Sequence, residues 1–135
     1  MLNMQFPTDK TYRITALFGE RIISKGSKNH KGIDIGCPTG TKVYAVADGV
    51  VEIHNQGSKG YGLYVVVNHS NGVKTLYAHG SGIPPGIKNG SIVKKGTVIM
   101  YSGNSGSSKG PHLHFEIIIN GNKVDPLPFF FKYGF

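Results

Sequence analysis

Glycine divides this chain into segments too short for long helices. It supplies 20 of the 135 residues, about twice its usual share of roughly 7%, and each glycine inside a helix costs about 1 kcal/mol relative to alanine. No window of about 11 residues keeps a helical period of apolar residues without a glycine or proline inside it. The pattern therefore predicts short strands joined by many turns.

The segments between the glycines are rich in β-branched and aromatic residues, as strands are. Asp48-Gly49 and Asn71-Gly72 are typical of hairpin turns, so the runs on either side of each should pair. We expect an all-β fold, a compact antiparallel sheet arranged as a sandwich or barrel, in a single domain over 1–135. Residues 80–91 hold four glycines and two adjacent prolines, which predicts a long loop. The expected strands are 13–18, 41–47, 50–54, 61–68, 73–77, 92–93, 97–101 and 114–119.

The net charge of +8 favours anionic partners such as nucleic acid, anionic cell-wall polymers or acidic membranes. Arg13 and Arg21 are the only arginines, and the lysines are scattered along the whole chain. The sequence offers neither a helix that could read base edges nor an aromatic stacking motif, so we expect no nucleic-acid partner. No apolar stretch approaches the roughly 18 residues that span a membrane.

Cys37 is the only cysteine, which excludes an intrachain disulfide and a cysteine metal cage. Residues 1–7 lack the basic segment followed by an apolar run that marks a secretory signal. An exported form of the chain would therefore depend on its core or on a bound metal for stability.

His30 and Asp34 form the first of three histidine contexts that point to chemistry. Their even spacing puts both side chains on one face of a strand, whereas Gly32, Gly36 and Pro38 argue against a helix here. Imidazole nitrogen and carboxylate oxygen both bind zinc, at about 2.0–2.2 Å. A pair at this spacing also occurs by chance, so alone it is only a weak indication of metal.

The second context is the H-x-H motif of His112 and His114. On a strand these two residues and Glu116 share one face, while Leu113 and Phe115 turn toward the core. Neighbours on that face lie about 6.6 Å apart, from a rise of about 3.3 Å per residue, so one ring can bind a metal while the other stands beside it. The alternative is a pair of exposed strand histidines, and Glu116 is either a partner that fixes an imidazole tautomer or a surface residue.

His79 is the third context, because it ends a hairpin strand and opens the loop over 80–91. Such a position suits a catalytic residue and equally suits an ordinary turn residue. His54 and His69 lie beside asparagines near strand ends and are interpreted as structural. We expect Tyr61 to pack on the strands rather than line a site.

Two histidines and one aspartate leave an open position on a tetrahedral zinc ion, as catalytic rather than structural sites do. The same ligand types also serve non-haem iron oxygenases. The ligand set by itself therefore leaves a zinc hydrolase and an iron oxygenase both open.

Taken in order, the motifs resemble those of the lysostaphin-type (LytM-like) zinc metalloendopeptidases, which are peptidoglycan hydrolases. The match runs from about Tyr12 to Pro126. Its most specific part is the H-x-x-x-D motif of His30 and Asp34, followed by the H-x-H motif. The softer matching segments are residues 14–21, 38–41, 47–51, 61–62, 76–79, 103–106 and 124–126.

The resemblance implies that His30, Asp34 and His114 bind Zn2+ and that His79 and His112 are catalytic without binding it. It implies an antiparallel β fold with a substrate groove that is floored by the sheet and walled by loops. The implied reaction is hydrolysis of a peptide bond in peptidoglycan, either in glycine bridges or in stem peptides. The implied partner is a peptidoglycan peptide, with anionic wall polymers as a further candidate, and we expect a monomer.

Two features depart from the family pattern. Gly80 stands where members usually carry a bulky apolar residue after the catalytic histidine, and the loop over 80–89 is longer than usual. Both alter one groove wall and hence substrate choice. Some relatives have lost ligands and act only as wall-binding modules, whereas this chain keeps all five site positions, which favours an active enzyme.

The cell wall is the expected place of action. Because the sequence shows no export signal while the implied substrate lies outside the membrane, we expect a phage lysin or a virion tail-associated lytic domain. A domain cut from a larger exported protein is the alternative.

Overall fold

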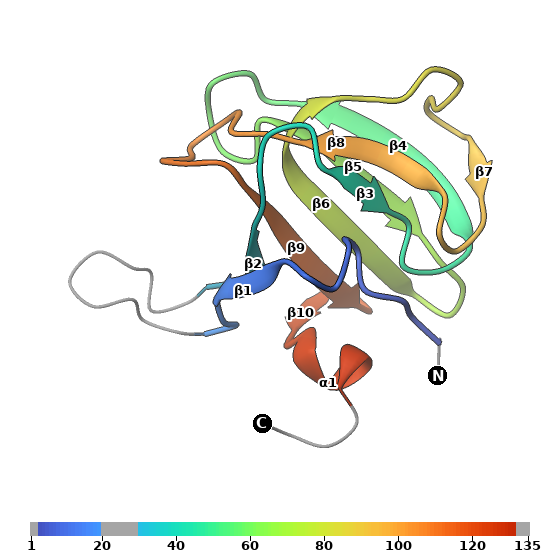
Figure 1. The fold of residues 1–135 in the computed structure, drawn as a ribbon. Coiled ribbons are helices and arrows are strands. Elements are labelled where there is room, and N and C mark those ends of the chain that lie inside the picture. The colour runs from blue at the N-terminus through green and yellow to red at the C-terminus, as the bar shows by residue number, and fades with distance from the viewer. Residues whose placement is uncertain (1–2, 20–29, 132–135) are drawn as a thin grey trace.

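Strands dominate the computed structural model, which describes residues 3–19 and 30–131 (Figure 1). A short helix, α1 (Leu127–Phe130), follows the last strand. The strands are β1 (Arg13–Ala16), β2 (Ile33–Gly36), β3 (Lys42–Tyr44), β4 (Gly49–Asn55), β5 (Leu63–Asn68), β6 (Val73–Gly82), β7 (Ile92–Val93), β8 (Val98–Ser102), β9 (His112–Ile119) and β10 (Asn122–Val124).

The described strands form one ten-stranded sheet whose main path runs β1-β2-β9-β6-β5-β4-β7, and every strand pair in it is antiparallel. β9 lies at the centre, with β6 on one side. Its other side is shared between β2, which pairs with the first half of β9, and β10, which pairs with the second half. Two segments far apart in sequence, β2 and β9, are thereby held in direct register.

The core lies between the main path of the sheet and a smaller layer formed by β3 and β8. β3 pairs with β8, and Figure 1 shows this pair crossing in front of β4, β5 and β6. Alternate side chains of β9 point into the core, where Leu113, Phe115 and Ile117 are fully buried in contact with the rest of the apolar cluster. The opposite residues of β9 are therefore displayed on the open face of the sheet.

The expected all-β, antiparallel fold class is confirmed, and the expected alternation of the H-x-H strand holds. Three elements are absent from the expected strands: β2, which entered only through the strand spacing of His30 and Asp34, β10, which is three residues long, and α1, which has no side-chain cap. In α1, Phe130 packs edge-on against Phe6 and also contacts Phe115, with ring centroids 5.2 and 5.7 Å away.

β6 extends further than its sequence suggested. The expected strand ended at Tyr77, but β6 continues through Gly82 and pairs there with β8. The reason is a β-bulge. Tyr77 of β6 pairs with Val65 of β5 and Gly80 pairs with Leu63, so β6 spans three residues where β5 spans two. His79 therefore lies inside a bulged strand, and the loop expected over 80–91 begins only after Gly82.

A chain of hydrogen bonds, partly exposed at His69 and buried at Tyr77, anchors the start of β6 to the neighbouring turn. The Nδ1–H of His69 donates to the Asp48 carbonyl at 2.7 Å, which leaves Nε2 to accept from the Thr75 hydroxyl at 2.8 Å. Thr75 in turn contacts the hydroxyl of Tyr77 at 2.6 Å, and Tyr77 accepts from the Val46 amide at 3.2 Å. The donor directions follow because a carbonyl oxygen can only accept.

His69 should make the stability of the fold depend on pH. Burial lowers the pKa of His69 below the usual histidine value of about 6.5, so its contribution to stability is fully present above that value and is lost as the pH falls below it. We expect metal-free wild type to lose more unfolding free energy between pH 7.5 and 5.5 than the non-titrating variant His69→Gln, measured by chemical denaturation. Equal losses in both proteins would contradict this role.

Candidate metal centre and active site

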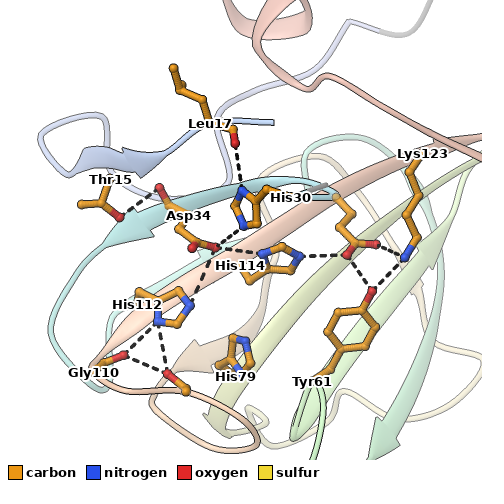
Figure 2. Close-up of polar contacts among 12 residues, drawn as sticks. Thr15, Leu17, His30, Asp34, Tyr61, His79, Gly110, His112, His114 and Lys123 are labelled. Carbon is orange, nitrogen blue, oxygen red and sulfur yellow. Dashed lines mark hydrogen bonds and ion pairs between the residues drawn. The ribbon is translucent and has the colours of Figure 1, made fainter. Parts of the chain in front are cut away.

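The pairing of β2 with β9 brings an acidic and a basic side chain together on the open face of the sheet. In this register Asp34 is the direct cross-strand partner of His114, and directly opposed side chains lie close enough to interact. Asp34 Oδ1 is 2.8 Å from His114 Nδ1 (Figure 2). His30 precedes β2 rather than lying on it, and its Nε2 reaches the same oxygen at 3.3 Å.

His30, Asp34 and His114, the three metal ligands expected from the sequence, lie together as a group that could hold a metal ion. One ligand atom from each lies within 4.8 Å of the others. The Nδ1–H of His30 donates to the Leu17 carbonyl at 2.9 Å, so its Nε2 lone pair faces the cluster. Two imidazole nitrogens and one carboxylate oxygen are a zinc donor set, and their convergence shows that the residues present fit the ion.

Electrostatics keep the carboxylate of this cluster ionised. Burial acts to raise the pKa of Asp34, but hydrogen bonds from His114 and His30 outweigh it and hold the pKa well below its usual range. Burial acts to lower the pKa of His114, but Asp34 and Glu116 on either side of the ring raise it to about 9. The metal-free site thus pairs an imidazolium with two carboxylates.

His112 stands beside this cluster with one ring nitrogen free. Its Nδ1–H donates to the Gly110 carbonyl at 2.8 Å, and its Nε2 points to Asp34 Oδ1 at 3.7 Å. This contact is longer than those of His30 and His114, in line with the strand-spacing expectation that one ring of the H-x-H motif binds metal while the other lies next to it. Figure 2 shows the ring turned toward the carboxylate.

The bulge in β6 turns His79 onto the same face. Simple alternation would send His79 to the core side with Tyr77, but its backbone adopts φ of 65°, a left-handed conformation that costs a non-glycine residue about 1–3 kcal/mol. Its ring lies 4.8 Å from that of His112 and 6.1 Å from that of His114, centroid to centroid. Burial lowers the pKa of His79, so the ring is neutral at pH 7.

Ser105 clamps this strained segment. Its backbone carbonyl accepts from His79 Nδ1–H at 2.7 Å. Its hydroxyl donates to the Gly80 carbonyl at 2.6 Å and accepts from the Leu63 amide at 3.1 Å, which ties both sides of the bulge together. The His79 Nε2 is therefore left available on the open face.

The unusual Gly80 has a packing explanation. A Cβ atom on Gly80 would lie 2.6 Å from the sulfur of Met100 and 3.2 Å from the Leu63 carbonyl oxygen. Met100 of β8, fully buried, occupies the space that a bulky residue at position 80 would need. Met100, on the core side, thus fills the space that the bulky residue of the family pattern would occupy.

The structure brings all five expected site residues together, and it adds groups that the sequence did not single out. Ser105 lies in a glycine-rich segment whose role only the bulge reveals. Lys123, near the end of the chain, and Tyr61, expected only to pack, both contact Glu116. Glu116 itself is almost fully buried, so the surface interpretation is wrong and its contact with His114 Nε2 at 2.8 Å makes it an imidazole partner.

Residues 28–126 match Peptidase family M23. The chain therefore belongs to this family of metallopeptidases, and the expected resemblance to lysostaphin-type enzymes is confirmed.

Relatives and solved structures agree with that family. The chain is 46% identical over 118 residues to the DD-carboxypeptidase/endopeptidase Mpg of Neisseria meningitidis and 38% identical over 126 residues to the peptidoglycan DD-endopeptidase ShyA of Vibrio cholerae. These alignments cover 85% and 91% of this chain but 26% and 29% of the two relatives. The chain thus spans about a quarter of the length of the curated relatives it matches.

A zinc-containing peptidase from Vibrio cholerae superposes with a TM-score of 0.79 at 35% identity, covering 89% of this chain and 37% of that one. The catalytic domain of lysostaphin from Staphylococcus simulans gives a TM-score of 0.78 at 29% identity, covering 89% of this chain and 92% of that one. Within the described part of the chain, no helix is long and apolar enough to cross a membrane.

Replacing Ser105 by alanine should weaken the bulge that carries His79. The Gly80 carbonyl and Leu63 amide lose their partner, and an unsatisfied buried polar group costs about 1–3 kcal/mol. We expect Ser105→Ala to lower the unfolding free energy by that amount and to shift the His79 ring resonances seen by 15N NMR, because the bulge that carries the ring loses both side-chain bonds.

Ser91→Ala is the matched control, because the Ser91 hydroxyl accepts only an exposed loop amide and should change stability by about 0.5 kcal/mol or less. If Ser105→Ala were as mild as Ser91→Ala and left the His79 resonances in place, the clamp would have no energetic role.

Proposed function

We propose that this domain is a zinc-dependent endopeptidase that hydrolyses peptide bonds in bacterial peptidoglycan. The observation that carries the proposal is the convergence of His30, Asp34 and His114 within 4.8 Å on an open sheet face, beside two further histidines whose Nδ1 atoms bond to backbone carbonyls. Membership of Peptidase family M23 supports the reaction class. The names of ShyA and of the zinc-containing Vibrio peptidase support the substrate and the metal.

His30 Nε2, Asp34 Oδ1 and His114 Nδ1 would hold the metal. Bound zinc supplies a Lewis acid that activates water near neutral pH and polarises the scissile carbonyl. Three protein ligands leave a coordination position open for that chemistry.

His79 and His112 would handle protons and charge around the scissile bond. Each donates Nδ1–H to a backbone carbonyl, so each presents an Nε2 lone pair that can take a proton from the attacking water and return it to the leaving amine. After taking the proton, either ring can stabilise the negative charge that develops on the carbonyl oxygen. The two rings are equivalent in this respect, and the choice of base between them stays open.

The relatives' names favour a stem-peptide bond over a glycine bridge, because ShyA is named a peptidoglycan DD-endopeptidase and Mpg a DD-carboxypeptidase/endopeptidase. The glycine bridge is the second candidate, because this chain superposes on the catalytic domain of lysostaphin over 92% of that domain. Mass spectrometry of fragments released from purified peptidoglycans, with and without glycine bridges, distinguishes the two.

Membership of a peptidase family favours hydrolysis over the iron oxygenase alternative. Metal analysis after native purification tests this choice. Stoichiometric iron in place of zinc would contradict the proposal. Turbidity loss of purified cell walls tests activity against a wall-binding role. Two origins stay predictions: a phage lysin or tail-associated lytic domain, and a domain of a larger exported protein. The genes beside this reading frame distinguish them.

Zinc should stabilise the fold as well as serve the reaction. Its ligands come from the start of β2 and from β9, 80 residues apart in sequence, so only the folded chain brings them together. A ligand specific to the folded state contributes about 4 kcal/mol at a thousand times its dissociation constant. We expect chelation to lower the melting temperature of wild type and zinc to restore it, while Asp34→Ala, the matched control, responds to neither. An unchanged melting curve in chelated wild type would contradict this.

Alanine substitutions should separate the ligands from the other two histidines. We expect Asp34→Ala and His114→Ala to lose both zinc and wall-lysis activity. His79→Ala should keep its zinc and lose turnover by about 10²–10⁴-fold, the contribution typical of a positioned acid–base group. His112→Ala should do the same, with a modest loss of zinc affinity because its Nε2 lies 3.7 Å from Asp34.

The measurements are zinc content per chain and lysis rate for all four variants. A zinc-free His79→Ala protein, or a His114→Ala protein that keeps its zinc, would show that the roles are assigned wrongly even if the protein is a peptidase.

A further inference from the structure

Glu116 is a carboxylate that the fold buries and that the hydrolytic roles above do not use. Its side chain is 1% exposed, and burying an ionised carboxylate is costly unless it is paired and hydrogen-bonded. Its Oε2 lies 2.8 Å from His114 Nε2 and 2.6 Å from the Tyr61 hydroxyl, and its Oε1 lies 3.2 Å from Lys123 Nζ in an ion pair. Figure 2 labels His114, Tyr61 and Lys123, and dashed lines run from all three to the carboxylate between them, which is unlabelled there.

The partners of Glu116 come from three different parts of the fold. His114 lies two residues away on β9, Tyr61 precedes β5, and Lys123 comes from β10. Lys123 Nζ also lies 3.0 Å from the Tyr61 hydroxyl and 5.7 Å from the centre of its ring. The Tyr61 hydroxyl donates to Oε2, and the Lys123 ammonium donates to that hydroxyl while it forms an ion pair with Oε1, so both groups favour the ionised carboxylate.

The backbone leaves room for this carboxylate. A Cβ atom on Gly32 would collide with the Phe115 carbonyl and would lie 2.9 Å from Glu116 Cγ. Gly32 lies between the ligand candidates His30 and Asp34, so the segment that carries them can cross β9 only because position 32 has no side chain.

Glu116 faces the ring nitrogen of His114 that points away from the metal-ligand candidates. In the metal-free site both nitrogens face a carboxylate, Nδ1 toward Asp34 and Nε2 toward Glu116. Nδ1 shares its cluster with Asp34 and His30, so a bound cation would take the place of the Nδ1 proton, while Glu116, which can only accept, would keep the proton on Nε2. His30, His79 and His112 have the opposite arrangement, with Nδ1–H held by backbone carbonyls.

We propose that Glu116, held in place by Tyr61 and Lys123, is a positioning residue that keeps His114 in its Nδ1-coordinating form and thereby sets the metal affinity of the site. The inference rests on the proposed zinc site. It adds to that site a requirement for an anion behind one ligand. The anion is Glu116, two residues beyond His114, and the residues that hold it, Tyr61 and Lys123, lie outside the metal-binding motifs.

The test is the zinc dissociation constant of Glu116→Gln, measured by competition with a chelator, together with 15N NMR of His114. Glutamine keeps the size of the side chain but has no charge. We expect the dissociation constant to rise by about 10–100-fold, as for other partners of ligating histidines, and the zinc-bound His114 to lose its uniform Nε2–H signature. Melting of the metal-free proteins separates this effect from a general loss of stability, which would not change the tautomer.

Glu52→Gln is the matched control. Glu52 pairs with His54 two residues along β4, with Oε1 to Nε2 at 3.2 Å, which repeats the sequence spacing of Glu116 and His114 on the exposed surface. It should leave zinc affinity unchanged. Tyr61→Phe removes one donor to Glu116 while keeping the ring, and should weaken zinc binding by about threefold or more, so it carries the test if Glu116→Gln does not fold.

A wild type that binds no zinc would overturn the proposed function and, with it, this inference. A wild type that binds zinc, with Glu116→Gln and Tyr61→Phe binding it equally well, would overturn this inference alone.

Discussion

The antiparallel register of β2 against β9 is the constraint on which the site depends. It sets Asp34 opposite His114 with 2.8 Å between Oδ1 and Nδ1. A slip of one residue would move each of these side chains to the other face of the sheet. The register is secured on the core side, where Ile33, Ile35 and Phe115 are fully buried. Apolar packing on one face of two strands therefore fixes the spacing of the polar groups on the other.

The remaining site residues come from irregular backbone rather than from register. His30 is held just before β2 by the Leu17 carbonyl, and His79 is turned onto the open face by a bulge with φ of 65°. Such strain persists where surrounding contacts compensate for it. Here Ser105 bonds to both sides of the bulge and to the His79 ring. The regular sheet supplies a rigid base, and a few clamped irregularities bring the last groups to the metal cluster.

The division between regular sheet and irregular backbone determines how much of the fold and site could be predicted from the sequence. Glycine spacing and β-rich runs predicted the antiparallel fold, and period-two alternation placed His112 and His114 on one face, because these signals are local. The end of β6 was predicted wrongly, since a bulge depends on pairing with β5 and on Ser105, 26 residues further along the chain. The link from Glu116 to Tyr61 and Lys123 could not be predicted either, because only the folded sheet brings these residues together.

The four histidines of the site differ in what stands behind each ring, and this difference gives their arrangement a chemical logic. His30, His79 and His112 each donate Nδ1–H to a neutral carbonyl, which fixes the tautomer without adding charge. His114 instead faces a carboxylate, which makes its ring a stronger donor toward a cation. This matches the proposed roles, because a neutral partner suits a ring that takes up and releases a proton near pH 7, whereas an anionic partner suits a ring that stays bound to a metal. In the proposed site Asp34 lies beside His30 and would supply the negative charge at the metal, so a carbonyl behind the His30 ring is sufficient.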